Sequence, residues 1–232
     1  MKAGIHSTLP FVSLLLFAGQ LVAGDFEPIF DGKSLEGWKA PNMSYWSVKD
    51  GAITAESTEA NPCKSNQFLV WQGGDVADFE LKLKFRLAGN RGNSGIQFRS
   101  IISPEKGGVG YQADILPGGA WCGALCDEYT GRKTLLATNG QKTIIDASGK
   151  RTSSRLGPPV KLKPAGEWND YYVVARGHHF VLRVNGQKSA EVIDNETEHF
   201  DAKGILALQL RSGPPMKVQF KDILLKRLPD EE

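Results

Sequence analysis

The sequence predicts an all-β protein built as a sandwich of two antiparallel sheets, and three observations favour this fold class. Apolar and charged residues alternate strictly over residues 79–87, the period of a strand with one buried face. Similar runs recur with turn residues at roughly 8–12-residue spacing, and Asp50-Gly51 and Asn185-Gly186 are pairs typical of tight hairpins. No stretch keeps a helical period of 3.6 residues, and no internal repeat is found.

Residues 1–24 are predicted to be a secretory signal peptide. A lysine precedes the apolar run Leu9–Ala18, and small residues follow it, with cleavage expected near Ala23 or Gly24. A membrane span would need about 20 apolar residues, and this run is interrupted by polar residues, proline and glycine. Residues 25–232 are therefore expected to form a single β-sandwich domain of a periplasmic or secreted protein without a membrane span.

The expected strands can be read in order from their alternation. They lie in residues 45–55, 78–87, 94–100, 110–116, 170–192, 204–212 and 216–228. In the cleanest of them, Phe79, Leu81, Leu83, Phe85 and Leu87 share one face and are expected to be buried between the sheets. Lys82, Lys84 and Arg86 share the other face and are interpreted as solvated. The stretch from Pro117 to Pro164, rich in Gly, Thr, Ser and Lys, is expected to be a long irregular insertion.

Charge and cysteine content exclude several classes of function. The net charge is only +2, and the basic residues show no stripe or tail in the sequence, so nucleic acid is not expected as a partner. The three cysteines, Cys63, Cys122 and Cys126, leave at least one thiol over. One disulfide is compatible with an oxidising compartment, and Cys122 with Cys126 would close a small loop. The spacing matches no structural zinc site.

Seven segments resemble, in order, the 3-keto-disaccharide hydrolase domain. They read "FDGKSLEGW", "DFELKLKFRL", "GNSGIQFRS", "GYQADI", "GEWNDYYVVARG", "VNG" and "GILALQLRSGPPMKVQFKDILLK". The resemblance covers Phe26 to Leu228 and implies a concanavalin A-like jelly-roll fold. It also implies a substrate, glycosides whose sugar is oxidised to a ketone at C3. The implied reactions are hydrolysis, or elimination across C1–C2 followed by hydration. Where relatives often read "LYDE" and "LQLHxGPP", this chain has Cys126 and Arg211.

A ketone at C3 acidifies the proton on C2, because the carbanion left behind is an enolate. Loss of the C1 leaving group then avoids the oxocarbenium ion of ordinary glycosidases. Such a site needs a base near C2, and it needs donors or a cation near the C3 oxygen. General base catalysis contributes roughly 10²–10⁴-fold, and oxyanion stabilisation is often the larger contribution.

Two neighbouring strands carry the candidate site residues. Gln97 and Arg99 alternate with apolar residues in one, and Gln112 and Asp114 do so in the other, so all four are expected on the concave face of one sheet. Glu128, placed by the insertion, is the preferred base and Asp114 the reserve. The full set of candidates comprises Glu128, Asp114 and Arg99 as catalytic residues and Gln97, Gln112, Trp121 and Gln209 as substrate-binding residues.

Other interpretations stay open beside the enzyme. A lectin-like carbohydrate-binding module without catalysis would use the same fold and the same polar face. A conventional glycanase of this fold is disfavoured, because its paired-carboxylate E-x-D-x-x-E signature is absent. No cofactor is expected, and scattered Asp, Glu and Asn fit a calcium site only vaguely. The expected partner is an oxidised carbohydrate, and the sequence leaves the oligomeric state open.

Overall fold

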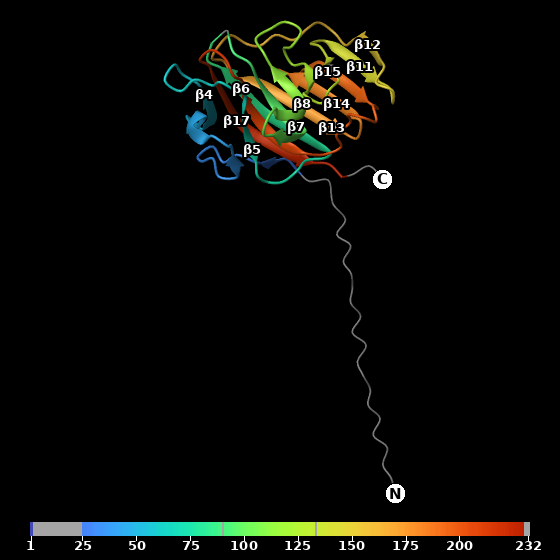
Figure 1. Cartoon of the computed structure of the whole chain (residues 1–232), viewed down its shortest axis with the longest axis horizontal. Coiled ribbons are helices and arrows are strands. Elements are labelled where there is room, and N and C mark those ends of the chain that lie inside the picture. Colours follow the sequence, from blue (N-terminus) through green and yellow to red (C-terminus); the bar gives the residue numbers. More distant parts are fainter. Residues whose placement is uncertain (2–24, 90, 133, 230–232) are drawn as a thin grey trace.

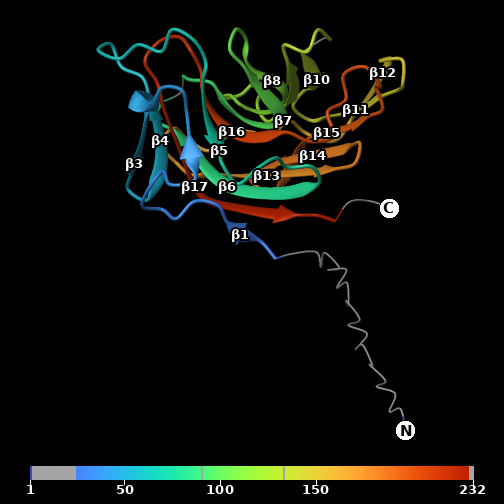
Figure 2. The ribbon, with the colours of Figure 1, turned by 60° about the horizontal axis from the view of Figure 1, so that its bottom comes forward.

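The computed structural model describes residues 1, 25–89, 91–132 and 134–229, and it has two sheets packed face to face (Figure 1). The larger sheet has the order β12-β11-β15-β14-β13-β6-β17-β4-β3, with β1 paired to β17. The smaller sheet has the order β10-β9-β8-β7-β16-β5-β2. In Figure 2, β7 and β16 of the smaller sheet lie above β6, β13 and β17 of the larger one. The predicted sandwich of two sheets is confirmed.

Seventeen strands and one short 3-10 helix make up the described fold. The larger sheet contains β1 (Glu27–Pro28), β3 (Trp46–Lys49), β4 (Ala52–Glu56), β6 (Phe79–Leu87), β11 (Gln141–Ile145), β12 (Arg151–Arg155), β13 (Asn169–Arg176), β14 (His179–Val184), β15 (Gln187–Asp194) and β17 (Lys217–Arg227). The smaller sheet contains β2 (Trp38–Lys39), β5 (Gln67–Trp71), β7 (Ser94–Ser103), β8 (Gly107–Ile115), β9 (Leu125–Glu128), β10 (Leu135–Ala137) and β16 (Ile205–Leu210). The 3-10 helix spans Met43–Tyr45.

The core lies between the two sheets. The alternation of apolar and charged residues in β6 correctly predicts which face of that strand is buried in the core. Five apolar residues of β6 are at most 5% exposed: Phe79, Leu81, Leu83, Phe85 and Leu87. From the smaller sheet, Phe98 packs its ring edge-on against Phe79, with ring centroids 5.6 Å apart. Burying apolar side chains such as these stabilises the fold by about 25 cal/mol per Å² of apolar surface.

Both predicted hairpin turns are present. Asp50 and Gly51 join β3 to β4 with φ of 53° and 71°, and Asn185 and Gly186 join β14 to β15 with φ of 50° and 79°. Two consecutive positive φ values match the right-handed twist of the flanking strands. Asn, Asp and Gly tolerate this backbone region best, which is why these pairs predict the turns.

The prediction of a long irregular insertion between Pro117 and Pro164 is wrong. This segment contains four strands, of which β9 and β10 extend the smaller sheet and β11 and β12 extend the larger one. β12 forms an edge of its sheet and is almost wholly exposed, and β10 is only three residues long. Edge strands of this kind bury no regular face, so their sequences lack the alternation that reveals a strand.

The three thiols are free and buried. Cys122 belongs to the core between the sheets, whereas Cys126 is the cross-strand partner of Gln112 on β8 and faces out of the sandwich. A disulfide between Cys122 and Cys126 is therefore not formed. The predicted signal peptide lies outside the described residues and stays a prediction. Among the described residues, no helix is long and apolar enough to cross a membrane.

Candidate active site

The outer face of the smaller sheet gathers the polar residues that alternate with its core residues. Ile96 and Phe98 are buried in the core, so Gln97 between them faces outward. Its cross-strand partner is Gln112, and the next pair on this face joins Asp114 to Gly95. A Cβ atom on Gly95 would lie 2.5 Å from Cδ of Gln112, so glycine is required there to make room for the glutamine. We call this surface the outer face.

Gln209 joins this face from β16, where Leu206, Leu208 and Leu210 point into the core. The four polar side chains are almost fully buried: Gln97 and Gln112 are 0% exposed, Gln209 is 1% and Asp114 is 2%. Gln112 donates to Oδ1 of Asp114 at 3.1 Å, and Gln97 donates to Oγ of Ser100 at 3.1 Å.

Each of these four residues keeps one buried oxygen without a donor among the described residues. The atoms are Oε1 of Gln97, Gln112 and Gln209, and Oδ2 of Asp114. An unpaired buried acceptor costs about 1–3 kcal/mol. Four of them lie on one face, and because all four oxygens are buried, a sugar hydroxyl would reach them only after the groups that cover them move.

Arg99 does not belong to this face, and the prediction that it lies beside Gln112 is wrong. A bulge shifts the register of β7 between Phe98 and Ser100, and Arg99 adopts a φ of 43°. Its guanidinium donates to the Ala77 and Gly177 carbonyls at 2.7 and 2.8 Å and to Asp78 at 2.6 Å. Arg99 is 1% exposed. Through these hydrogen bonds it joins the residues before β6 to the turn between β13 and β14, at one end of the larger sheet.

The structure does bring Glu128 to the outer face. Glu128 is the cross-strand partner of Gly110, two residues along β8 from Gln112, and therefore points the same way. It sits on a paired strand, β9, and not in the irregular insertion that the sequence predicted. The carboxylate is partly buried, which gives it one side toward solvent.

Burial raises the pKa of both carboxyl groups on this face. The pKa of Asp114 rises to about 7, first because the group is desolvated and second because the negative charge of Glu128 is close. Desolvation also raises the pKa of Glu128, while Arg211 acts to lower it. Carboxyl groups whose pKa is shifted toward neutrality are typical of sites that transfer protons near pH 7.

Arg211 is the site residue that the sequence reasoning missed. It follows the end of β16 in the same alternation as Gln209, and its positive charge acts on both Asp114 and Glu128. The side chain is exposed, and it makes no hydrogen bond or ion pair with another described residue. The alternation in "LQLR" could have revealed this residue, because it places Gln209 and Arg211 on the same face of the strand.

A cavity of about 620 Å³ opens beside these residues. Phe68, the cross-strand partner of Gln209, lines it from the outer face. The β7–β8 hairpin bends over to the same cavity, because Gly107 packs directly against the Phe68 ring. Two further lining residues, Tyr129 and Ser212, directly follow Glu128 and Arg211 in the chain. The cavity therefore adjoins the chain positions of both charged residues, although neither Glu128 nor Arg211 is among the residues that line it.

Trp121 is not among the residues that line this cavity. It lies in the loop between β8 and β9 and is 39% exposed. Of the predicted site residues, the structure brings Gln97, Gln112, Asp114, Gln209 and Glu128 together on the outer face. It separates Arg99 from them.

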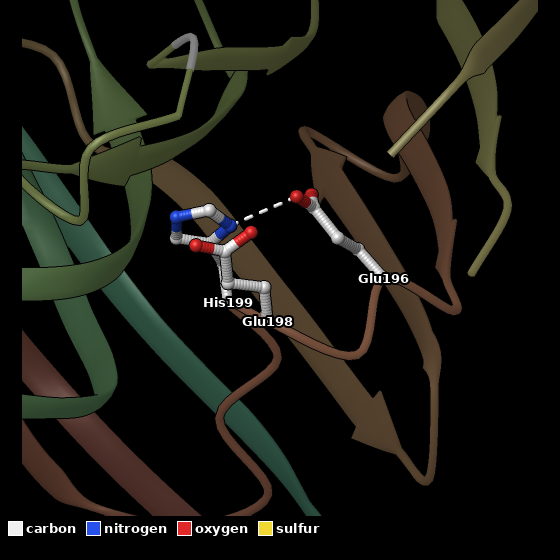
Figure 3. Close-up of side chains that lie close together, drawn as sticks. All are labelled: Glu196, Glu198 and His199. Carbon is white, nitrogen blue, oxygen red and sulfur yellow. Dashed lines mark hydrogen bonds and ion pairs between the residues drawn. The ribbon is translucent and has the colours of Figure 1, made fainter. Parts of the chain in front are cut away.

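One group of three residues has the spacing of a metal site among the described residues. Glu196, Glu198 and His199 follow β15 and hold their ligand atoms within 4.8 Å of one another (Figure 3). Both oxygens of Glu196 are already engaged, one by Nδ1 of His199 at 2.8 Å and the other by Nη1 of Arg132 at 2.8 Å. A guanidinium so close opposes a second cation, so we interpret the group as part of an ion-pair network.

Asp114→Asn is expected to change how stability depends on pH. The Asp114 carboxyl takes up its proton near pH 7 when folded, against an ordinary pKa of 3.8. The folded state then binds more protons than the unfolded state between these values, so this group makes stability fall as pH rises through the window. Because of this group, the free energy of unfolding falls by at most about 1.4 kcal/mol per pH unit. Urea unfolding of both proteins at several pH values measures this. The free energy of unfolding of the variant should increase relative to that of the parent as the pH rises, and a difference that stays constant with pH would contradict the raised pKa.

A jelly-roll sandwich with buried glutamines and carboxylates on the outer face of one sheet, next to a cavity, is the architecture of a class of carbohydrate-active β-sandwich proteins. The model of the 3-keto-alpha-glucoside-1,2-lyase-like domain matches residues 25–226, and the chain belongs to this family. No curated protein sequence matches the chain.

Solved structures with this fold have low sequence identity to the chain. A candidate glycosyl hydrolase from Parabacteroides distasonis has a TM-score of 0.62 at 18% identity, covering 88% of this chain and 94% of its own. Carbohydrate binding module CBM66 from Bacillus subtilis has a TM-score of 0.57 at 14% identity, covering 82% and 95%. A protein of unknown function with a galectin-like fold from the same organism has a TM-score of 0.55 at 9% identity, covering 85% and 92%. These similarities establish the fold.

Proposed function

We propose that this protein is an exported enzyme that cleaves the glycosidic bond of 3-keto-glycosides by removing the proton on C2. The observation that carries the proposal is that the positive charge of Arg211 acts on the partly buried carboxylate of Glu128, and that the residues directly after these two line one cavity. Family membership supports the substrate class. Arg211 takes the place that the sequence analysis had given to Arg99.

The reaction divides into three steps: proton removal, loss of the leaving group and addition of water. Glu128 accepts the C2 proton, and the electron pair of the C–H bond forms the enolate, whose oxygen at C3 is stabilised by the guanidinium of Arg211. The enolate then expels the oxygen on C1, and this leaving group takes a proton from Asp114 or from solvent. Addition of water across the new C1–C2 double bond releases the 3-keto sugar and completes a net hydrolysis.

The two carboxyl groups of the site suit different steps of the proposed reaction. Glu128 is partly exposed at the end of β9 and directly precedes the cavity residue Tyr129, so we place its carboxylate within reach of a substrate. Asp114 is 2% exposed and has a pKa of about 7, so near neutrality it holds a proton part of the time. That proton makes Asp114 the candidate acid, whereas Glu128 remains the candidate base.

The test is to incubate the purified protein with a 3-keto-glucoside or 3-keto-trehalose in D₂O and to read the products by mass spectrometry. Elimination followed by hydration should place deuterium on C2, after spontaneous exchange in an enzyme-free control is subtracted. Product without deuterium at C2 would exclude proton abstraction, and absence of product would exclude the substrate class. The intact mass of the protein recovered from its host reports cleavage near Ala23 or Gly24.

Tyr129→Ala is expected to raise the KM for a keto-disaccharide by about tenfold while leaving kcat within a few-fold. Tyr129 lines the cavity, is 49% exposed and has a φ of 58°, a strained backbone for a bulky residue. Its ring offers an apolar face to a sugar, and loss of an aromatic contact costs about 0.5–1.5 kcal/mol. Steady-state kinetics with Tyr129→Phe as the matched control checks this, and an equal loss in both variants would point to the hydroxyl.

A carbohydrate-binding module without catalysis is the second candidate, and one observation favours it. Gln97, Gln112 and Gln209 carry orphan acceptors, and their amide groups do not transfer protons, so these three residues suit recognition of hydroxyl groups and not acid–base catalysis. Calorimetric titration with an unoxidised disaccharide separates the two functions. Tight binding together with no turnover of any 3-keto-glycoside would favour the module.

A further inference from the structure

The outer face of the larger sheet, opposite the candidate active site, gathers cations that are dispersed in the sequence. Tyr172 on β13 pairs across the sheet with Lys82 on β6 and with Arg183 on β14, which places a cation on each side of the ring. Neighbouring strands lie about 4.8 Å apart, so these three side chains form a short row across three strands. We call it the cationic row.

A second set of cations lies beside this row and carries an electrostatic cost. Lys84 and Lys221 are direct cross-strand partners, and like charges placed opposite one another destabilise a sheet. Asp222 relieves part of this repulsion through an ion pair of 3.2 Å with Lys84. Lys221 makes no ion pair among the described residues, and it lies over the Trp168 ring at 4.5 Å. The ring thus holds the charge in place without neutralising it.

The rings on this face position cations and are therefore not free stacking platforms. Arg86 also lies over Trp168 at 4.5 Å, and Lys82 lies over the Phe26 ring at 3.8 Å. Base stacking on single-stranded nucleic acid needs open aromatic faces. Covered rings disfavour that ligand and favour one that is recognised by its anionic groups.

A groove of about 740 Å³ follows the cationic row. Lys82, Tyr172 and Arg183 line it, and so do two carboxylates, Asp170 and Asp222. Carboxylates repel a densely charged phosphate backbone, but they accept hydrogen bonds from sugar hydroxyls. Cations interspersed with acceptors along an open groove match a chain that carries both hydroxyls and spaced anions.

From these features we propose that the outer face of the larger sheet binds an acidic polysaccharide, whose carboxylate or sulfate groups pair with Lys82, Lys84, Arg183 and Lys221. This site is separate from the candidate active site, because the two occupy the outer faces of different sheets. It would hold the protein on a polymer while the other face stays open. Binding here does not depend on the proposed reaction.

The test is affinity electrophoresis of the whole protein in gels that contain polygalacturonate, uncharged dextran or single-stranded DNA. Polygalacturonate should retard the protein, added salt should weaken the retardation, and dextran should have no effect. The variant Lys84→Ala/Lys221→Ala should bind polygalacturonate about tenfold more weakly, which corresponds to about 1.4 kcal/mol.

The matched control is Lys39→Ala/Lys203→Ala, which removes the same charge from exposed positions outside this face. It should keep its affinity within twofold of the parent, and turnover of a small 3-keto-glycoside should be unchanged in both variants. Circular dichroism and the melting temperature check that each variant is folded. Absence of retardation, equal losses in the two variants, or equal retardation by DNA would overturn the proposal.

Discussion

Glu128→Gln is expected to lower kcat on a 3-keto-glycoside by roughly 10²-fold or more, with little change in KM. Glutamine keeps the shape of the side chain and removes its basicity, so the substrate still binds but the C2 proton stays in place. Stopped assays of product formation over a range of substrate concentrations measure both constants. The charge-matched control is Glu59→Gln, an exposed residue far from the outer face in sequence, which should retain parental kinetics.

The same experiment separates the two carboxyl groups of the site. If Asp114 is the base instead, Asp114→Asn will show the larger fall in kcat, and Glu128→Gln will keep most of its activity. Full activity in both variants would remove proton abstraction by this face from consideration. In that case the unpaired acceptors of the three glutamines would support a function in binding without catalysis.

Arg132→Ala is expected to lower the free energy of unfolding by about 3–5 kcal/mol. Arg132 pairs with Asp127, with Asp194 at 2.7 Å and with Glu196 at 2.8 Å, and its side chain is only 5% exposed. Removing the guanidinium leaves three buried or nearly buried carboxylates without their shared counter-ion. Urea unfolding at neutral pH measures the loss.

Two comparisons sharpen that result. Arg155→Ala removes an arginine of exposed β12 whose side chain donates one hydrogen bond among the described residues, to the Gly157 carbonyl, and it should cost at most about 0.5 kcal/mol. The penalty of Arg132→Ala should also shrink at acid pH, because protonation relieves the unpaired carboxylates. A loss below about 1 kcal/mol at neutral pH would contradict the view that this network stabilises the sandwich.

Local alternation and turn chemistry were sufficient to predict the sandwich from the sequence. The period of two identifies the buried side of β6, and Asp50-Gly51 and Asn185-Gly186 identify two hairpins. Alternation also places Gln97 and Gln112 on one face, since each lies between two core residues. These properties depend on neighbours in the chain and on the geometry of a single strand, which the sequence contains in full.

Only the tertiary structure decided which charged groups reach the candidate site. One extra residue in β7 turns Arg99 out of its predicted alternation and toward Asp78, and a bulge leaves no clear mark in the sequence. Arg211 and Glu128 come together because β16 and β9 belong to one sheet, although 83 positions separate them in the chain. Strand order and bulges arise from packing between distant segments, and for that reason the sequence alone predicted the outer face but chose the wrong arginine.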